Sequence, residues 1–447
     1  MSSWAERDKR VLWHPFTPVA EWERLEPLVV VRGEGNYLVA DDGRRYLDGV
    51  SSLWCNVHGH AHPRLNRALQ RQAEAVAHST FLGLSHPPGI ELAERLVALA
   101  PKGLTRVFYS DSGSTAVEIA LKQAFQYWSH VGQGQRQRFV RLEHAYHGDT
   151  LGAVGVGGID LFHRVFGPLI VQSIPAPAPV LYPDRERRGP EAIREAALAA
   201  LEGVLAKEGQ TVAAVVMEPL VQGAAGMLVH PPGFLRGVAE LCRRHGVLLI
   251  CDEVATGFGR AGTMFACEQE GVTPDFLCVA KGLTAGYLPL AATLAREEIY
   301  DAFRAERREM KTFFHGHTFT GNPLACAVAL ESLAILDEEN VLGRVQERAV
   351  DLRRLLETEI RPLPWVGDIR QVGLMIGIEL VKDRAAAEPF PWDDFRGVQV
   401  CQVVRNHGVI LRPLGDVIVW MPPLSLTREE AAILATATRR AIEETCG

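Results

Sequence analysis

Lys281 has the sequence setting that most favours covalent chemistry. It directly follows the apolar run 276–280 and precedes Gly282. Burial at the end of such a strand lowers the pKa of an amine, which can then attack a carbonyl and form a Schiff base. The chain has seven lysines against forty arginines, and no other lysine has a strand-end setting. Taken alone, a structural lysine whose tip reaches solvent is the more common case.

Two further strand ends carry polar groups that could bind a small molecule. Asp252 ends the apolar run 247–251, where a carboxylate must pair with an arginine, a metal or the ring nitrogen of a cofactor. The segment 110–115 follows another strand and leads into a helix, so Gly113 and Ser114 lie at a helix N-terminus, which can bind phosphate. Each feature alone also fits a structural role, as an ion pair or as a capped helix.

The three features together match the three polar groups of pyridoxal phosphate. Its aldehyde needs a lysine, its pyridine nitrogen an anion and its phosphate a helix N-terminus. Ligands of open parallel sheets lie beyond the carboxyl ends of the strands, so these residues are expected at one edge. The combination predicts a pyridoxal-phosphate enzyme.

The elements that must position these residues alternate between helices and short apolar strands. Runs such as 212–217 are apolar throughout, which indicates strands buried on both faces of a parallel sheet. We therefore predict an α/β fold with a mostly parallel central sheet covered by helices, plus a smaller α+β domain that begins within a long helical pattern from 323 to about 361. The expected division is an N-terminal segment 1–60 packing with the small domain, a large cofactor-binding domain 61–335 and a C-terminal small domain 336–447.

Composition argues against several classes of protein. The 447 residues carry a formal net charge of −7 without a basic block, so no nucleic-acid partner is expected. The apolar runs are far shorter than the ~18 residues of a membrane helix, so no membrane partner is expected either. The eight cysteines include no Cys-x-x-Cys pair and fit reduced thiols in the cytoplasm. Histidines 58, 60 and 62 alternate as strand-borne metal ligands would, but we expect no metal.

Longer motifs extend this prediction to the whole chain. The sequence resembles the class III, or ω-amino, branch of the fold-type I pyridoxal-phosphate aminotransferases and, within it, the enzymes of biotin synthesis that act on 8-amino-7-oxononanoate. The matching segments are Trp13-His14-Pro15-Phe16-Thr17, 51–60, Asp111-Ser112-Gly113-Ser114, Tyr146-His147-Gly148-Asp149-Thr150, 252–260, 315–319 and Leu411-Arg412-Pro413.

The resemblance implies catalytic roles for three residues. Lys281 would bind the cofactor as a Schiff base and then move a proton between the substrate Cα and the cofactor. Asp252 would keep the pyridine nitrogen protonated, and Tyr146 would stack on the ring.

The resemblance also implies how the phosphate is held. Gly113 and Ser114 would bind it, joined by His317 and Thr318 from a partner subunit. A homodimer with active sites at the interface would follow.

Substrate contacts are implied at Lys281 and at five further positions. Arg412 would bind the carboxylate of the oxononanoate through a charge-assisted contact, and Trp54 and Gly316 would line the substrate tunnel. Phe16 and Leu53 stand where many members have Tyr and Trp. The usual donor of the family is S-adenosyl-L-methionine, but a branch with Phe and Ile or Leu here is associated with L-lysine, so both donors stay open.

Some alternatives remain. Another class III ω-amino acid or diamine aminotransferase would share the same core. A nicotinamide-dependent dehydrogenase would need a glycine fingerprint after the first strand, which is absent, and a non-catalytic scaffold would tolerate loss of Lys281. Arg260 is expected to pair with Asp149 rather than to contact substrate, and Glu218 is either structural or a cofactor contact.

Overall fold

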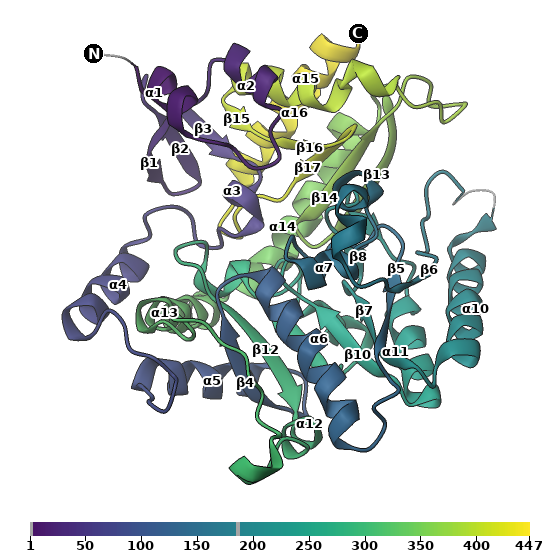
Figure 1. Cartoon of the computed structure of the whole chain (residues 1–447). Coiled ribbons are helices and arrows are strands. Elements are labelled where there is room, and N and C mark those ends of the chain that lie inside the picture. Colours follow the sequence, from purple (N-terminus) through teal and green to yellow (C-terminus); the bar gives the residue numbers. More distant parts are fainter. Residues whose placement is uncertain (1–2, 185–187) are drawn as a thin grey trace.

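A seven-stranded sheet forms the centre of the larger part of the molecule (Figure 1). The computed structural model describes residues 3–184 and 188–447, so the first two residues of the expected segment 1–60 lie outside it. One strand, β12, runs antiparallel to both of its neighbours, and the other pairings are parallel. The prediction of a mostly parallel sheet is therefore confirmed. The strand order is β4 (Leu104–Ser110), β12 (Ala291–Arg296), β11 (Phe276–Val279), β10 (Leu248–Asp252), β7 (Val212–Met217), β5 (Arg138–Leu142) and β6 (Ile174–Ala176).

Helices cover both faces of this sheet, which explains why its central strands are apolar throughout. In β10, Leu249 and Cys251 belong to one apolar cluster and Leu248 and Ile250 to another. The second cluster includes the buried face of α6 (Gly113–His130). The first includes residues of α5 (Pro87–Leu99), α10 (Pro190–Glu208) and α11 (Phe234–His245). Alternate residues of each strand thus pack under different helices.

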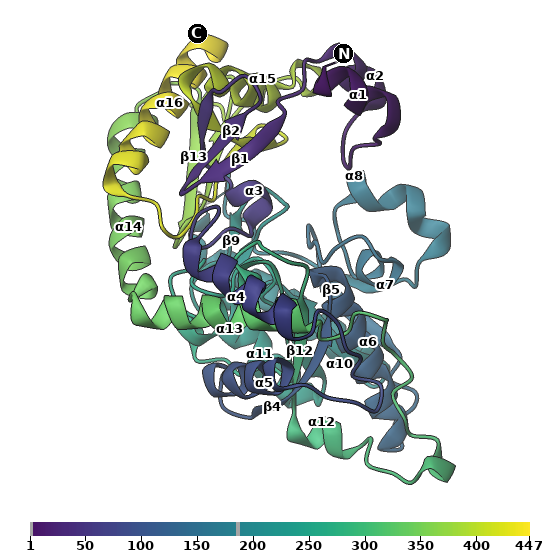
Figure 2. The same cartoon turned by 90° about the vertical axis from the view of Figure 1, so that its left-hand side faces the viewer.

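Both ends of the chain gather beyond one end of the large sheet (Figures 1 and 2). The N-terminal strands β1 (Val30–Glu34), β2 (Tyr37–Ala40) and β3 (Arg45–Asp48) form one sheet with β15 (Val409–Ile410), which pairs in parallel with β3. An antiparallel sheet follows in the order β13 (Val366–Val372), β14 (Met375–Leu380), β17 (Val417–Trp420) and β16 (Arg412–Leu414). The division of the chain at residues 60 and 335 stays a prediction.

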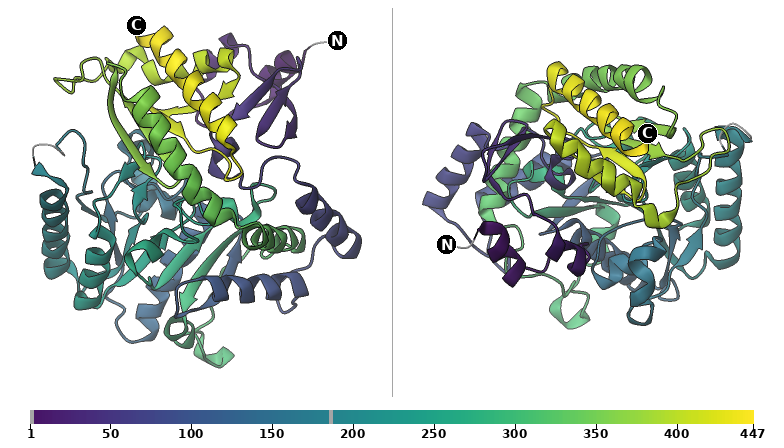
Figure 3. Two further views of the ribbon diagram at one scale, coloured as in Figure 1. Left: turned by 180° about the vertical axis from the view of Figure 1, so that it is seen from behind. Right: turned by 90° about the horizontal axis from the view of Figure 1, so that it is seen from above.

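The long helical pattern after residue 323 is two helices and not one. α13 (Pro323–Glu338) ends before Asn340, whose φ of 46° is left-handed, and α14 (Val341–Leu355) begins directly after it. Asparagine tolerates this conformation better than most residues, so it breaks the helix without interrupting the apolar period. α14 lies beside α16 (Arg428–Cys446) on the back of the molecule (Figure 3).

Further α-helices and two short strands lie before or between these elements of the described chain, together with short 3-10 helices and one π-helical turn. These α-helices and strands are α1 (Trp4–Val11), α2 (Val19–Arg24), α3 (Ser51–Trp54), α4 (Pro63–Ala75), α7 (Leu151–Gly155), α8 (Asp160–His163), α12 (Glu297–Asp301), α15 (Arg396–Val403), β8 (Val221–Gln222) and β9 (Leu228–Val229). Across the described residues, no helix combines the length and apolar character needed to cross a membrane.

Candidate active site

Two adjacent parallel strands bring Asp252 and Lys281 to the same edge of the sheet. Asp252 is the last residue of β10 and lies opposite Cys278 of β11, and Lys281 follows two residues after β11 ends. The helix α6 begins three residues after β4 at the same edge. The predicted grouping at the carboxyl ends of the strands is thus present.

Lys281 lies on the face of an aromatic ring. Its Nζ is 5.0 Å from the centroid of the Trp54 ring, and no carboxylate among the described residues forms an ion pair with it. Burial lowers the pKa of Lys281, although the negative charges of Asp252 and Glu218 act in the other direction and raise it. The backbone φ of Lys281 is 44°, a strained conformation of the kind that concentrates at functional sites. These features fit an amine nucleophile.

Asp252 is buried and pairs with a histidine rather than with an arginine. Its Oδ2 lies 2.7 Å from Nδ1 of His147, and its Oδ1 accepts the backbone N–H of Val254. Burial would lower the pKa of His147, but the hydrogen bond and charge of Asp252 outweigh burial and raise it. Asp252 is therefore held in place by two hydrogen-bond partners, one from a side chain and one from the backbone. Glu253, by contrast, accepts hydrogen bonds from Thr256 and from backbone N–H groups, which is a structural role.

The first residues of α6 lie very close to the segment that follows β10. Ser112 caps the helix by accepting the N–H of Thr115. A side chain at Gly113 would place its Cβ 2.5 Å from Cγ1 of Val254, so only glycine allows the helix to begin this close to the end of β10. Ser114 Oγ lies 2.7 Å from Oγ1 of Thr150, which fixes its orientation.

Tyr146 belongs to an aromatic group beside Asp252. Its hydroxyl donates to Asp149 at 2.8 Å, and its ring stacks on His163 with centroids 6.1 Å apart. Burial, followed by the hydrogen bond to Asp149, raises the pKa of Tyr146. Phe162 contacts both Tyr146 and the N-terminal Phe16 edge-on. The chain's N-terminal segment therefore reaches this group, and Figure 2 shows the loop between α1 and α2 coming down toward α8.

The expected ion pair between Arg260 and Asp149 is wrong. Arg260 is buried, and its guanidinium donates to the carbonyl oxygens of Pro422 and Asn56 and to Ser51 Oγ. Burial lowers its pKa to about 10. Arg260 thus ties together the N-terminal segment, the loop after β10 and the C-terminal segment.

The remaining predicted residues lie on exposed loops or strand ends. Gly316 and Thr318 are exposed, and Nε2 of His317 lies 3.7 Å from Oδ1 of Asp111, just before α6 of the same chain. Arg412 is exposed at the start of β16, with no ion-pair partner among the residues that the structure describes. The contribution of His317 and Thr318 to a partner's site and the roles of Gly316 and Arg412 stay predictions.

Histidines 58, 60 and 62 do not form one cluster, although the rings of His58 and His62 have centroids 5.8 Å apart. His58 bonds Ser332, and His60 bonds Asp48. Within residues 3–184 and 188–447, no three His, Cys, Asp or Glu side chains are placed to hold a metal ion.

Sequence reasoning missed His147 and left Glu218 undecided. Glu218 is buried, accepts the N–H groups of Tyr146 and Gly223, and has its pKa raised by burial to about 7. The position of His147 next to Tyr146 in the matched motif was the available signal.

The residues present fit pyridoxal phosphate. A buried carboxylate lies at one strand end, an amine of lowered pKa at the next, and a helix N-terminus with a close glycine lies beside them. Nε2 of His147 is buried without a hydrogen-bond partner among the described residues. Lys281, Asp252 and the N-terminus of α6 match the aldehyde, the ring nitrogen and the phosphate of the cofactor, respectively.

Comparisons with known proteins agree with this geometry. A family model described as aminotransferase class III matches residues 19–442. An adenosylmethionine-8-amino-7-oxononanoate aminotransferase of Geobacter sulfurreducens is 53% identical over 441 residues, covering 98% of this chain and 97% of that protein. The crystal structure of the Methanocaldococcus jannaschii protein of the same name has a TM-score of 0.94 and 43% identity, covering 99% of this chain and 98% of that one. An amine transaminase from an uncultivated Pseudomonas species, solved in its PLP-bound form, has a TM-score of 0.93 and 39% identity, covering 98% and 99%.

Proposed function

Because the chain belongs to the class III aminotransferases, we propose that it transfers an amino group to the ketone of 8-amino-7-oxononanoate and forms 7,8-diaminononanoate in biotin biosynthesis. It is an aminotransferase that depends on pyridoxal phosphate. The acceptor rests on one observation, the 53% identity to the Geobacter protein over nearly the whole length of both chains.

Each residue of the site would have a separate role in the reaction. Bound pyridoxal phosphate supplies an aldehyde that carries the amino group and a ring that takes up an electron pair. Asp252, held by His147, would keep the ring nitrogen protonated, and the N-terminus of α6 at Gly113 and Ser114 would hold the phosphate. Lys281 would anchor the cofactor and, once released, move the proton at the substrate Cα. Its lowered pKa favours the neutral amine that this transfer requires.

Substrate recognition is assigned to residues around this centre. Trp54, next to Lys281, would line the path to it together with Phe16, Leu53 and Gly316, in a homodimer with active sites at the interface. Arg412 would bind the substrate carboxylate. The eight free cysteines support a cytoplasmic location.

Two donors are compatible with the site. The relatives' names include adenosylmethionine, and Trp54 offers one aromatic face to a sulfonium or an adenine. Phe16 and Leu53, both largely exposed, lack the hydroxyl and second aromatic face that would strengthen that contact, which favours L-lysine as the alternative. A second candidate function, transfer from other ω-amines, is supported by the likeness to the amine transaminase.

Half-reactions test the proposal. The cofactor-loaded enzyme is mixed separately with S-adenosyl-L-methionine, L-lysine, γ-aminobutyrate or ornithine, and loss of its visible absorbance is followed. Addition of 8-amino-7-oxononanoate to the converted enzyme should restore the absorbance. Conversion by γ-aminobutyrate or ornithine without recovery by the oxononanoate would establish the second candidate instead.

A further inference from the structure

The turn that carries Trp54 has an unusually strained backbone. Ser51, Ser52 and Trp54 have φ values of 51°, 60° and 65°, in the left-handed region that residues other than glycine rarely adopt. Three such residues within four positions persist only where the surroundings determine the backbone. The turn, residues 51–54, connects β3 to the segment that reaches the large sheet, so its shape fixes where Trp54 lies.

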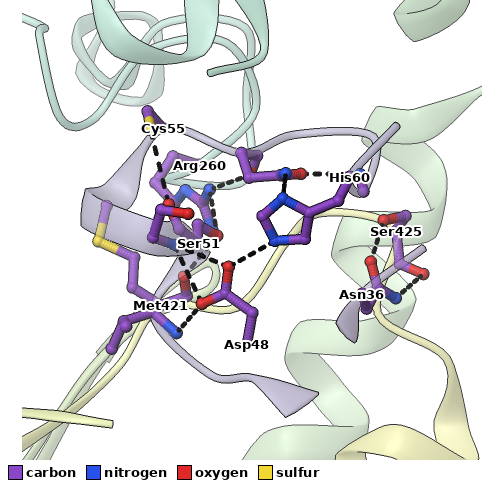
Figure 4. Close-up of polar contacts among 12 residues, drawn as sticks. Asn36, Asp48, Ser51, Cys55, His60, Arg260, Met421 and Ser425 are labelled. Carbon is purple, nitrogen blue, oxygen red and sulfur yellow. Dashed lines mark hydrogen bonds and ion pairs between the residues drawn. The ribbon is translucent and has the colours of Figure 1, made fainter. Parts of the chain in front are cut away.

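A buried carboxylate holds this turn from inside. Asp48, fully buried at the end of β3, accepts the N–H of Ser52 at 2.8 Å through Oδ2 and at 3.0 Å through Oδ1, and that of Val50 at 3.3 Å. Its Oδ2 also lies 2.9 Å from Nε2 of His60 (Figure 4). The other ring nitrogen of His60 contacts the side-chain amide of Asn56, which orients the imidazole.

The first residue of the turn, Ser51, is held by other groups. Ser51 Oγ donates to the carbonyl of Met421 and accepts from Arg260 (Figure 4). These contacts fix where the turn begins, whereas Asp48 acts on the N–H of Ser52, whose φ and ψ of 60° and −83° are far from helical values. Asp48 is therefore the group that selects the unusual backbone leading to Trp54.

The shape of the turn affects the surroundings of the Lys281 amine. The Trp54 ring has its centroid 5.0 Å from the Lys281 amine, and it also lies close to Gly223, where an added Cβ would be 3.2 Å from Cζ3 of the ring. A side chain at 223 would press against the ring, so glycine leaves room for it here. A change in the turn would move the ring away from Lys281 without touching the strand ends that would hold the cofactor.

We propose that Asp48, oriented by His60, is a positioning residue for the amino donor, because it fixes the turn 51–54 and thereby holds the Trp54 ring beside Lys281. The inference rests on the proposed aminotransferase function. It assigns to Asp48 an effect on substrate binding and none on cofactor binding.

Three variants test this role in the donor half-reaction. Asp48→Asn keeps the volume but replaces one acceptor oxygen with a donor that faces the N–H of Ser52. It should raise the apparent dissociation constant of the donor about tenfold, equal to about 1.4 kcal/mol, and leave the limiting rate within about threefold. His60→Gln should raise that constant by a smaller factor. His58→Gln is the matched control, because His58 is a buried histidine of the same segment that bonds Ser332 and not Asp48, and it should leave the constant unchanged.

Two measurements without turnover separate positioning from general damage. The affinity of each apo-protein for pyridoxal phosphate should stay within about twofold of the wild type. The near-ultraviolet circular dichroism contributed by Trp54, obtained by subtracting the spectrum of Trp54→Phe in each background, should weaken in Asp48→Asn and not in His58→Gln.

The outcomes are distinct. An unchanged donor constant in Asp48→Asn, or equal increases in His58→Gln and His60→Gln, overturns the positioning role. If Asp48→Asn does not fold, the comparison of His60→Gln with His58→Gln decides the question. A wild-type enzyme that accepts an amino group from no donor instead refutes the proposed function, and with it this inference.

Discussion

Gly113→Ala should weaken cofactor binding because it pushes the start of α6 away from the end of β10. The new Cβ would meet Val254 Cγ1 at 2.5 Å and Cγ2 at 2.8 Å. Ordinary carbon contacts are about 3.5–4.0 Å, so the helix or Val254 must move by about 1 Å. The backbone N–H of Val254 bonds Asp252, so either movement changes the distance between the phosphate site and the ring-nitrogen site.

The expected size of the effect follows from overpacking. Inserting one methyl into a closely packed place costs about 1–3 kcal/mol, so the dissociation constant for pyridoxal phosphate should rise about 5- to 150-fold. Titration of the apo-protein with the cofactor, followed by visible absorbance, measures the constant. Val254→Ala removes both contacted atoms, so the double variant should recover most of the lost affinity.

Gly203→Ala is the matched control. Gly203 lies within α10, and a Cβ there would meet nothing within 4 Å. It should raise the thermal midpoint slightly, because alanine favours helix, and leave cofactor affinity unchanged. Wild-type affinity in Gly113→Ala, or no recovery in the double variant, would show that α6 does not bind the phosphate at this closely packed start.

Three further predictions concern other groups of the site. Lys281→Ala should lose the visible absorbance of the cofactor-loaded enzyme and all turnover, and full activity in this variant would refute the role of Lys281. Leu53→Trp adds an aromatic face and should increase the preference for S-adenosyl-L-methionine over L-lysine about tenfold, measured as the ratio of half-reaction rate constants; an unchanged ratio would separate residue 53 from donor choice. Burial raises the pKa of Glu218 to about 7, so the folded protein holds this proton more tightly than the unfolded chain, and stability falls as the pH rises from about 4.5 to 7. Glu218→Gln should remove this loss and gain about 3 kcal/mol relative to wild type over that range in urea unfolding of the apo-protein; a difference independent of pH would contradict the raised pKa.

The strand-end residues were predictable because their signal is local. An apolar run predicts a strand, and Asp252 or Lys281 follows that run directly, so the strand and its polar group can be predicted from consecutive residues. Parallel pairing then brings the ends of β10 and β11 together, so the grouping followed from the fold class alone. The break between α13 and α14 at Asn340 was missed because the apolar pattern continues across it.

Contacts between distant segments were not predictable. His147 and Asp252 are 105 residues apart, and nothing near either residue specifies the other. Arg260 was assigned to Asp149 on charge, but its donors are satisfied by neutral oxygens from residues 51, 56 and 422, which only the folded chain brings together. Asp48 carries no motif of its own, and its role depends on the strained turn that follows it.

Formation of 7,8-diaminononanoate is the most direct test of the proposed reaction. The cofactor-loaded enzyme is incubated with 8-amino-7-oxononanoate and either S-adenosyl-L-methionine or L-lysine, and the product is identified by mass spectrometry, with Lys281→Ala as the blank. We expect the diamine with the wild-type enzyme and one of the two donors, and none with the variant. No diamine with either donor, from an enzyme that binds the cofactor and transaminates another amine, would contradict the proposed acceptor.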